Sequence, residues 1–150
     1  MLWRYSYQPA LFWRILSAQI RGKGGAMKVL LVEDSKFLRV ATEQALTSAG
    51  YEVVSAGDGD QAVRLAREHL PALILLDVML PKMSGPDVLR VLKNDPATAA
   101  IPVMMLTSLS QKNAKQLLKD GATSFYEKSD SMLGKGPDSL FAVVDRMLKK

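Results

Sequence analysis

The sequence contains no cysteine and a single histidine, His69. Without cysteine there can be no disulfides, thiolate metal sites or thiol nucleophiles. One histidine argues against a metal site built from several histidines and against a catalytic triad that depends on histidine. The chain also lacks a run of 18 uninterrupted apolar residues, so the sequence predicts no transmembrane helix. Carboxylates, lysines and hydroxyls remain as candidates for chemistry.

The chain of 150 residues has the length of one domain, and its 48% hydrophobic content is enough for one core. Its net charge of +5 is unevenly distributed. Residues 1–26 carry four basic residues and no acid, whereas residues 27–150 are close to neutral. The predicted folded part is therefore nearly neutral, and we expect no direct binding of nucleic acid.

Residues 1–26 differ in composition from the rest of the chain and end in the glycine-rich stretch RGKGGA at 21–26, which predicts a flexible linker. We interpret residues 27–150 as the folded domain. Three interpretations of residues 1–26 stay open: an extension from a misplaced start before Met27, a helix that binds a membrane surface or a partner, or a segment packed on the domain. The second rests on apolar residues at helical spacing, which are Leu11, Phe12, Ile15, Leu16 and Ile20.

From residue 28 onward, short apolar runs alternate with amphipathic stretches. The apolar runs predict buried strands at 28–32, 51–55, 72–76, 101–106 and 123–127. The amphipathic stretches predict helices at 36–48, 60–69, from Pro86 onward, 111–119 and 138–148. This alternation predicts an α/β fold with a five-stranded parallel sheet covered by helices on both faces.

Polar residues with chemical potential follow four of these predicted strands. Glu33 and Asp34 follow the first strand, Asp77 the third, Thr107 the fourth and Lys128 the fifth. The carboxyl ends of parallel strands meet at one edge of the sheet, where open sheets of this kind bind ligands. If the first and third strands are neighbours, three carboxylates share one pocket.

Such a pocket is electrostatically unfavourable without a cation. Two carboxylates ~5 Å apart repel each other by roughly 3 kcal/mol at an effective dielectric of about 20. Either one carboxylate takes up a proton, or a hard divalent ion binds. Mg²⁺ suits this geometry, since it is usually held by one or two carboxylates and several waters. With Lys128 and Thr107 nearby, the cluster resembles a site for a phosphoryl group that a carboxylate could attack.

Four segments resemble the signatures of a two-component response-regulator receiver domain. They are VLLVEDS at 29–35, LDVMLPKMSG at 76–85, MLTS at 105–108 and Lys128. The resemblance covers about residues 27–148, with each motif in order. It implies a flavodoxin-like, doubly wound sheet with strand order 2-1-3-4-5, which is the order of the chemotaxis member of the family.

The resemblance also implies roles for individual residues. Asp77 would be the phosphoacceptor, carrying a 4-aspartylphosphate. Lys128 would pair with the phosphoryl group, and Thr107 would be the switch hydroxyl with Phe125 as the switch aromatic. Ser108 supplies the small residue that the family has beside the phosphoryl group. The implied Mg²⁺ ligands are Glu33, Asp34, Asp77 and the backbone carbonyl of Met79.

The function implied by the resemblance is a phosphorylation-dependent signalling switch, bacterial and cytoplasmic, rather than an enzyme, apart from slow self-dephosphorylation. A histidine kinase or phosphotransfer protein would supply the phosphoryl group, and a downstream protein would read the signal. The alternative is that the chain is a receiver fragment of a larger hybrid kinase or regulator.

Two other functions are disfavoured by single positions. A phosphatase of the haloacid-dehalogenase kind needs a second acid two residues after its nucleophile, and that position is Met79. A flavodoxin-like cofactor binder needs a phosphate loop after the first strand, where Glu33 and Asp34 would repel the phosphate.

The chain departs from the receiver pattern after Lys128, where Ser129 replaces the usual cis-proline. A cis bond before serine costs ~2.5–4 kcal/mol, so we expect a trans bond and a differently shaped loop. The segment 129–136 is also longer than the usual link to the last helix.

Overall fold

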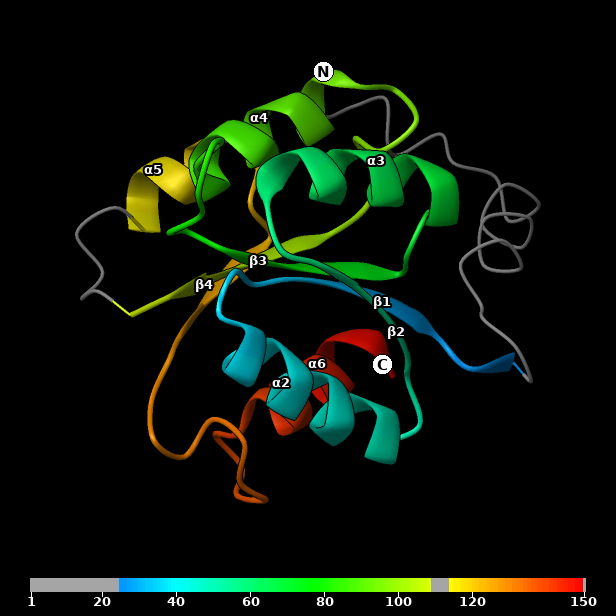
Figure 1. The fold of residues 1–150 in the computed structure, drawn as a ribbon, viewed down its shortest axis with the longest axis vertical. Helices are drawn as coiled ribbons and strands as arrows, with labels where there is room; N and C mark the ends of the chain where they lie inside the picture. Colours follow the sequence, from blue (N-terminus) through cyan, green and yellow to red (C-terminus); the bar gives the residue numbers. More distant parts are fainter. Residues whose placement is uncertain (1–24, 109–113, 150) are drawn as a thin grey trace.

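The computed structural model describes residues 25–108 and 114–149, which form alternating strands and helices (Figure 1). The strands are β1 (Lys28–Val32), β2 (Glu52–Ala56), β3 (Leu73–Asp77), β4 (Val103–Thr107) and β5 (Ser124–Glu127). The helices are α2 (Lys36–Ser48), α3 (Gly59–His69), α4 (Gly85–Asn94), α5 (Ala114–Lys119) and α6 (Leu140–Leu148). Residues 1–24 of the predicted extension, which include its apolar stripe at 11–20, lie outside the described residues.

The strands form one parallel sheet in the order β2-β1-β3-β4-β5, which confirms the predicted fold class and strand order. The central strands align closely: Val32 of β1 lies beside Leu76 of β3, and Asp77 lies beside Leu106 of β4. Every residue of β3 is buried, as its continuous apolar sequence predicts for a strand covered on both faces. This register brings the ends of β1, β3 and β4 to one edge.

Helices cover both faces of the sheet. Figure 1 shows α3, α4 and α5 on one side and α2 and α6 on the other. Each side has its own apolar core, formed by alternate residues of the same strands: Leu30 and Ile74 belong to the first core, and Leu31 and Leu75 to the second. The sheet is therefore a rigid base for side chains at its edge.

Serine and aspartate side chains start most of the helices. Ser35, Asp58, Ser84 and Ser139 each accept a hydrogen bond from a backbone N–H in the first turn of the following helix. Ser35 directly follows Glu33 and Asp34, so the turn that holds the two acids is closed by the start of α2. Within the described residues, no helix is long and apolar enough to span a bilayer.

Several predicted boundaries were wrong by one or two residues. Asp77 and Thr107 are the last residues of β3 and β4, rather than the first residues after them. β4 begins at Val103 rather than at 101, because Pro102 has no N–H for the ladder and the Ile101 N–H donates to the carbonyl of Thr98. The last helix begins after its cap, Ser139, and the predicted helix start at 111–113 lies outside the described residues.

Candidate functional site

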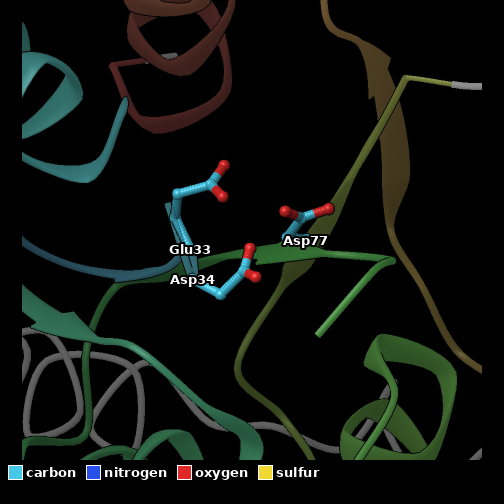
Figure 2. Close-up of side chains that lie close together, drawn as sticks. All are labelled: Glu33, Asp34 and Asp77. Carbon is cyan, nitrogen blue, oxygen red and sulfur yellow. The ribbon is translucent and has the colours of Figure 1, made fainter. Parts of the chain in front are cut away.

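Three carboxylates gather at the carboxyl edge of the sheet. Glu33 and Asp34 follow β1, and Asp77 ends the neighbouring β3. One oxygen from each carboxylate lies within 4.8 Å of the others, and Figure 2 shows the side chains directed toward a common space. Glu33 and Asp77 are buried, with 2% and 4% exposure, whereas Asp34 is exposed. The predicted acidic cluster is therefore present, with one of its members open to solvent.

Lys128 joins the two buried carboxylates. Its Nζ lies 2.7 Å from Glu33 Oε1 and 2.9 Å from Asp77 Oδ2. Burial is the largest influence on the pKa of Lys128 and lowers it, but the hydrogen bonds and negative charges of Glu33 and Asp77 together outweigh burial and raise the pKa. The ammonium group is held charged between two acids, and the site has one positive charge against three negative ones.

Backbone amides fix the second oxygen of each buried carboxylate. The Ser35 N–H donates to Glu33 Oε2 at 3.1 Å, and the Met79 N–H donates to Asp77 Oδ1 at 3.1 Å. Both contacts span two residues within a tight turn, so the strand-end loops themselves orient the acids. Met79 is 64% exposed beside the cluster.

Gly85 allows the turn after Asp77 to close. Its N–H donates to the carbonyl of Val78 at 2.9 Å, and a Cβ at this position would lie 2.2 Å from the carbonyl oxygen of Asp77. No side chain fits there without moving the backbone of the acid. The LDVMLPKMSG motif therefore requires glycine at position 85, because a side chain there would displace the backbone of Asp77.

Thr107 lies on β4, the strand next to β3, and Phe125 lies on β5, the strand beyond β4. Thr107 ends β4 opposite Glu127, and its carbonyl accepts a hydrogen bond of 2.7 Å from the Lys128 N–H. Phe125 is partly buried and packs on the core between the sheet and α3, α4 and α5. The backbone of Thr107, the predicted switch residue, is thus hydrogen-bonded to the backbone of Lys128. Phe125, the predicted switch aromatic, lies on β5, which ends directly before Lys128.

The segment after Lys128 is closed on itself. The Lys128–Ser129 bond is trans, as expected from the serine. Met132 is buried, and its carbonyl accepts a hydrogen bond from the Leu140 N–H at 2.9 Å. The Tyr126 hydroxyl donates to the carbonyl of Asp138 at 2.6 Å. The longer connection to α6 is therefore tied to the domain at its ends, while residues 133–138 are exposed.

Sequence reasoning missed two basic residues around the site. Arg39, in α2, donates from Nη1 to the carbonyls of Glu33 at 2.7 Å and Asp34 at 3.4 Å. Lys82, in the turn after Asp77, forms an ion pair of 3.6 Å with Asp58, the cap of α3. The sequence holds no clear signal for either contact, because motif spacing places backbone elements but does not show where a long side chain turns.

Comparison with known proteins agrees with this arrangement. The family model of the response regulator receiver domain matches residues 29–132. The chain belongs to this family. Receiver domains act in two-component signalling as phosphoacceptors rather than enzymes of the usual kind, and they interact with histidine kinases and downstream effectors.

Two curated relatives differ in how much of them the chain covers. The chain is 42% identical over 102 residues to the response regulator PleD of Caulobacter vibrioides, but this match spans only 22% of PleD. It is 35% identical over 98 residues to the polar-differentiation response regulator DivK of Brucella anthropi, and this match spans 80% of DivK. Both matches cover about two thirds of the chain.

Solved structures share the fold. The chemotaxis protein CheY4 of Vibrio cholerae superimposes with a TM-score of 0.72 at 31% identity, over 82% of this chain and 99% of CheY4. The receiver domain of the sensor histidine kinase PA1611 of Pseudomonas aeruginosa superimposes with a TM-score of 0.71 at 26% identity, over 83% of this chain and 99% of that domain. The PA1611 domain has a magnesium ion coordinated in its active site cleft.

Proposed function

We propose that the protein accepts a phosphoryl group on Asp77 and passes the signal to a protein partner. The observation that carries this proposal is the bridge of Lys128 between Glu33 and Asp77 within the three-carboxylate cluster. Asp77 ends the strand between β1 and β4, so it has Glu33 and Asp34 on one side and Thr107 on the other. No other carboxylate among the described residues has this position.

In the proposed reaction, a carboxylate oxygen of Asp77 attacks phosphorus and a new O–P bond forms. The P–N bond to a histidine of the donor breaks, and its electron pair stays on the imidazole nitrogen, which takes up a proton. Lys128 faces Asp77 Oδ2 at 2.9 Å and is placed to neutralise phosphoryl oxygens. Water would later hydrolyse the acyl phosphate slowly, which resets the switch.

The residues present suit Mg²⁺. The cluster offers only hard oxygen donors within 4.8 Å of one another, and Mg²⁺ prefers such donors while keeping several waters. Asp34, Asp77 and the carbonyl of Met79 would hold the ion, with Glu33 completing the acidic site. When bound, the ion neutralises charge on the incoming phosphoryl group.

Intact-mass measurement with a small phosphodonor such as phosphoramidate tests this function. In the presence of Mg²⁺, the protein should gain about 80 Da, and the added mass should be released by hydroxylamine, which cleaves acyl phosphates. The Asp77→Asn variant should gain nothing, while Asp130→Asn, which changes an exposed acid outside the cluster, should behave like the parent. Labelling of Asp77→Asn equal to that of the parent would refute the assignment.

The surroundings of the cluster favour a protein as the natural donor. Phe37, three residues after Asp34, is 84% exposed, and Met79 is 64% exposed. Two large apolar side chains beside an acidic site suit contact with a folded partner. Phe37→Ala should slow transfer from a phosphohistidine protein but not from phosphoramidate. Leu118→Ala, which removes an exposed apolar side chain from α5, is the matched control.

We further propose that Thr107 and Phe125 carry the signal away from the site. A phosphoryl group on Asp77 adds acceptor oxygens near the end of β4, and a shift of Thr107 toward them would alter the space beside Phe125. Thr107→Ala should accept phosphate normally but show smaller phosphorylation-induced NMR shifts in α5 and β5. Thr107→Ser keeps the hydroxyl and should keep the shifts; shifts of parental size in Thr107→Ala would exclude this route.

The relatives allow a second setting for the same chemistry. PleD is much longer than the matched region, and the PA1611 domain belongs to a sensor histidine kinase. The receiver could accordingly work in the cytoplasm as part of a larger regulator or kinase. The mass of the native gene product in its own cells separates the two settings.

A further inference from the structure

Arg39 holds the peptide backbone of the acidic pair. Its side chain turns back from the first half of α2, and Nη1 lies 2.7 Å from the carbonyl oxygen of Glu33 and 3.4 Å from that of Asp34. A Cβ on Gly57, in the loop after β2, would lie 3.2 Å from the same nitrogen. The guanidinium group therefore sits between the β1–α2 turn and the β2–α3 loop.

The choice of partners is informative. Arg39 binds the backbone of two acids of the cluster, yet within the described residues it forms no ion pair with any of the three carboxylates and donates only to neutral carbonyls. An arginine paired with Asp34 would compete with a bound cation for that carboxylate. As arranged, Arg39 leaves the oxygen atoms of the cluster to Lys128 and to a metal ion.

These contacts control the geometry of Asp34 in particular. Glu33 is fixed by Lys128 and by the Ser35 N–H, and Asp77 by Lys128 and the Met79 N–H. The carboxylate of Asp34 is exposed and has no hydrogen bond or ion pair in the described parts of the chain. Its position thus depends on the two peptide planes whose carbonyls Arg39 binds.

We propose that Arg39 is a positioning residue that preorganises Glu33 and Asp34 for a divalent cation. This inference rests on the proposed function, since it assumes that the cluster binds Mg²⁺. Outer contacts that orient metal ligands typically change metal affinity by 10–100-fold. Because the Ser35 cap of α2 still closes the turn directly after Asp34, we place the effect of losing Arg39 at the lower end of that range, about tenfold.

The direction of the change in Mg²⁺ affinity when Arg39 is replaced distinguishes a positioning role from a purely electrostatic one. Arg39 is a positive charge near the cation, so removing it would strengthen Mg²⁺ binding if electrostatic repulsion were its only influence. Loss of preorganisation weakens binding instead. Arg39→Met removes the charge and the donors together and keeps an apolar stem, so the two explanations predict opposite changes in affinity.

Calorimetric titration with Mg²⁺ tests the inference. We expect Arg39→Met to bind Mg²⁺ about tenfold more weakly than the parent, and Arg39→Lys, which can reach one carbonyl, to fall between them. Arg64→Met, which removes an exposed arginine of α3, should match the parent. If Arg39→Met is folded and binds as tightly as the parent or more tightly, the inference is wrong. If the parent itself does not bind Mg²⁺, the proposed function fails instead.

A second variant keeps the test decisive should Arg39→Met fail to fold. Gly57→Ala retains the arginine but places a methyl group 3.2 Å from its Nη1, closer than an ordinary contact, so the guanidinium must shift relative to the two carbonyls. We therefore expect a several-fold weaker affinity for Mg²⁺. Gly136→Ala, where a Cβ would meet nothing within 4 Å, is the matched control. Unchanged affinity in both Gly57→Ala and Arg39→Lys would overturn the inference.

Discussion

Two partly buried lysines lie at opposite ends of the parallel sheet and have opposite surroundings. Lys128 follows β5 at the carboxyl edge and bridges Glu33 and Asp77. Lys93, in α4, extends its side chain to the turn before β4, where Nζ donates to the carbonyls of Ala99 at 3.0 Å and Ile101 at 2.7 Å. Burial lowers the pKa of Lys93, whereas the pKa of Lys128 is raised because its two acids outweigh burial.

The difference shows how one residue type serves structure at one edge and chemistry at the other. Neutral carbonyls satisfy the donors of Lys93 and close the turn before β4, but they do not balance its charge. At the other edge the acids outnumber the lysine, and this excess of negative charge supports the proposal that the site binds a cation and accepts a phosphoryl group. The amino edge is therefore built for stability, and the carboxyl edge for binding.

Glycine substitutions should give the largest contrast between the edges. Gly85→Ala would place a Cβ 2.2 Å from the backbone oxygen of Asp77, and we expect the free energy of unfolding to fall by about 3 kcal/mol or more. Gly121→Ala would meet the Lys93 side chain at 2.8 Å with a φ of +112°. Because that side chain can shift, we expect a loss of about 1–2 kcal/mol from backbone strain. Urea unfolding measures both, and equal losses would contradict the steric account.

Replacing each lysine with methionine should separate their roles. Lys128→Met leaves Glu33 and Asp77 without their cation, so we expect a loss of about 2–3 kcal/mol at neutral pH. Lys93→Met leaves two carbonyls without a donor but also removes a buried charge, so we expect about 1 kcal/mol.

Conditions that reduce carboxylate repulsion should distinguish the stability loss of Lys128→Met from that of Lys93→Met. Lowering the pH or adding Mg²⁺ should restore part of the stability of Lys128→Met, because each relieves the repulsion between carboxylates. Neither should help Lys93→Met. Equal rescue of both variants would remove the distinction drawn between the two edges.

Raising the pH into the alkaline range should have the smallest effect on stability. Deprotonation of Lys128 should lower the free energy of unfolding, whereas deprotonation of Lys93 should raise it. The folded pKa of Lys128 lies above the usual 10.5, so its contribution to stability is full below that value and is lost as the pH rises through the folded pKa. The folded pKa of Lys93 lies below 10.5, so burial of its charge costs stability until the pH rises through that value. NMR titration of the two side chains in metal-free protein should give a higher pKa for Lys128 than for Lys93. The reverse order of the two pKa values would contradict this account.

The sequence predicted the elements of this fold well because buried strands and amphipathic helices leave clear patterns. The resemblance to receiver domains supplied the strand order, and the residues that end the strands marked the carboxyl edge. The exact ends of β3 and β4 were missed, since Asp77 and Thr107 pair within the ladder despite being polar. The carbonyl contacts of Arg39 and Lys93 were also missed, because they depend on how a long side chain turns across loops from other parts of the chain.

The central claim is that the carboxyl edge carries an excess of negative charge that a divalent cation relieves. Thermal or urea unfolding with and without Mg²⁺, at matched ionic strength, tests it most directly. At a Mg²⁺ concentration of about 100 Kd, the parent should gain roughly 2.7 kcal/mol of unfolding free energy, and Asp34→Ala should lose this gain. Without metal, Asp34→Ala should be at least as stable as the parent, because one repelling charge is gone, and Asp130→Ala should respond to Mg²⁺ like the parent. A parent whose stability is the same with and without millimolar Mg²⁺ would contradict the account.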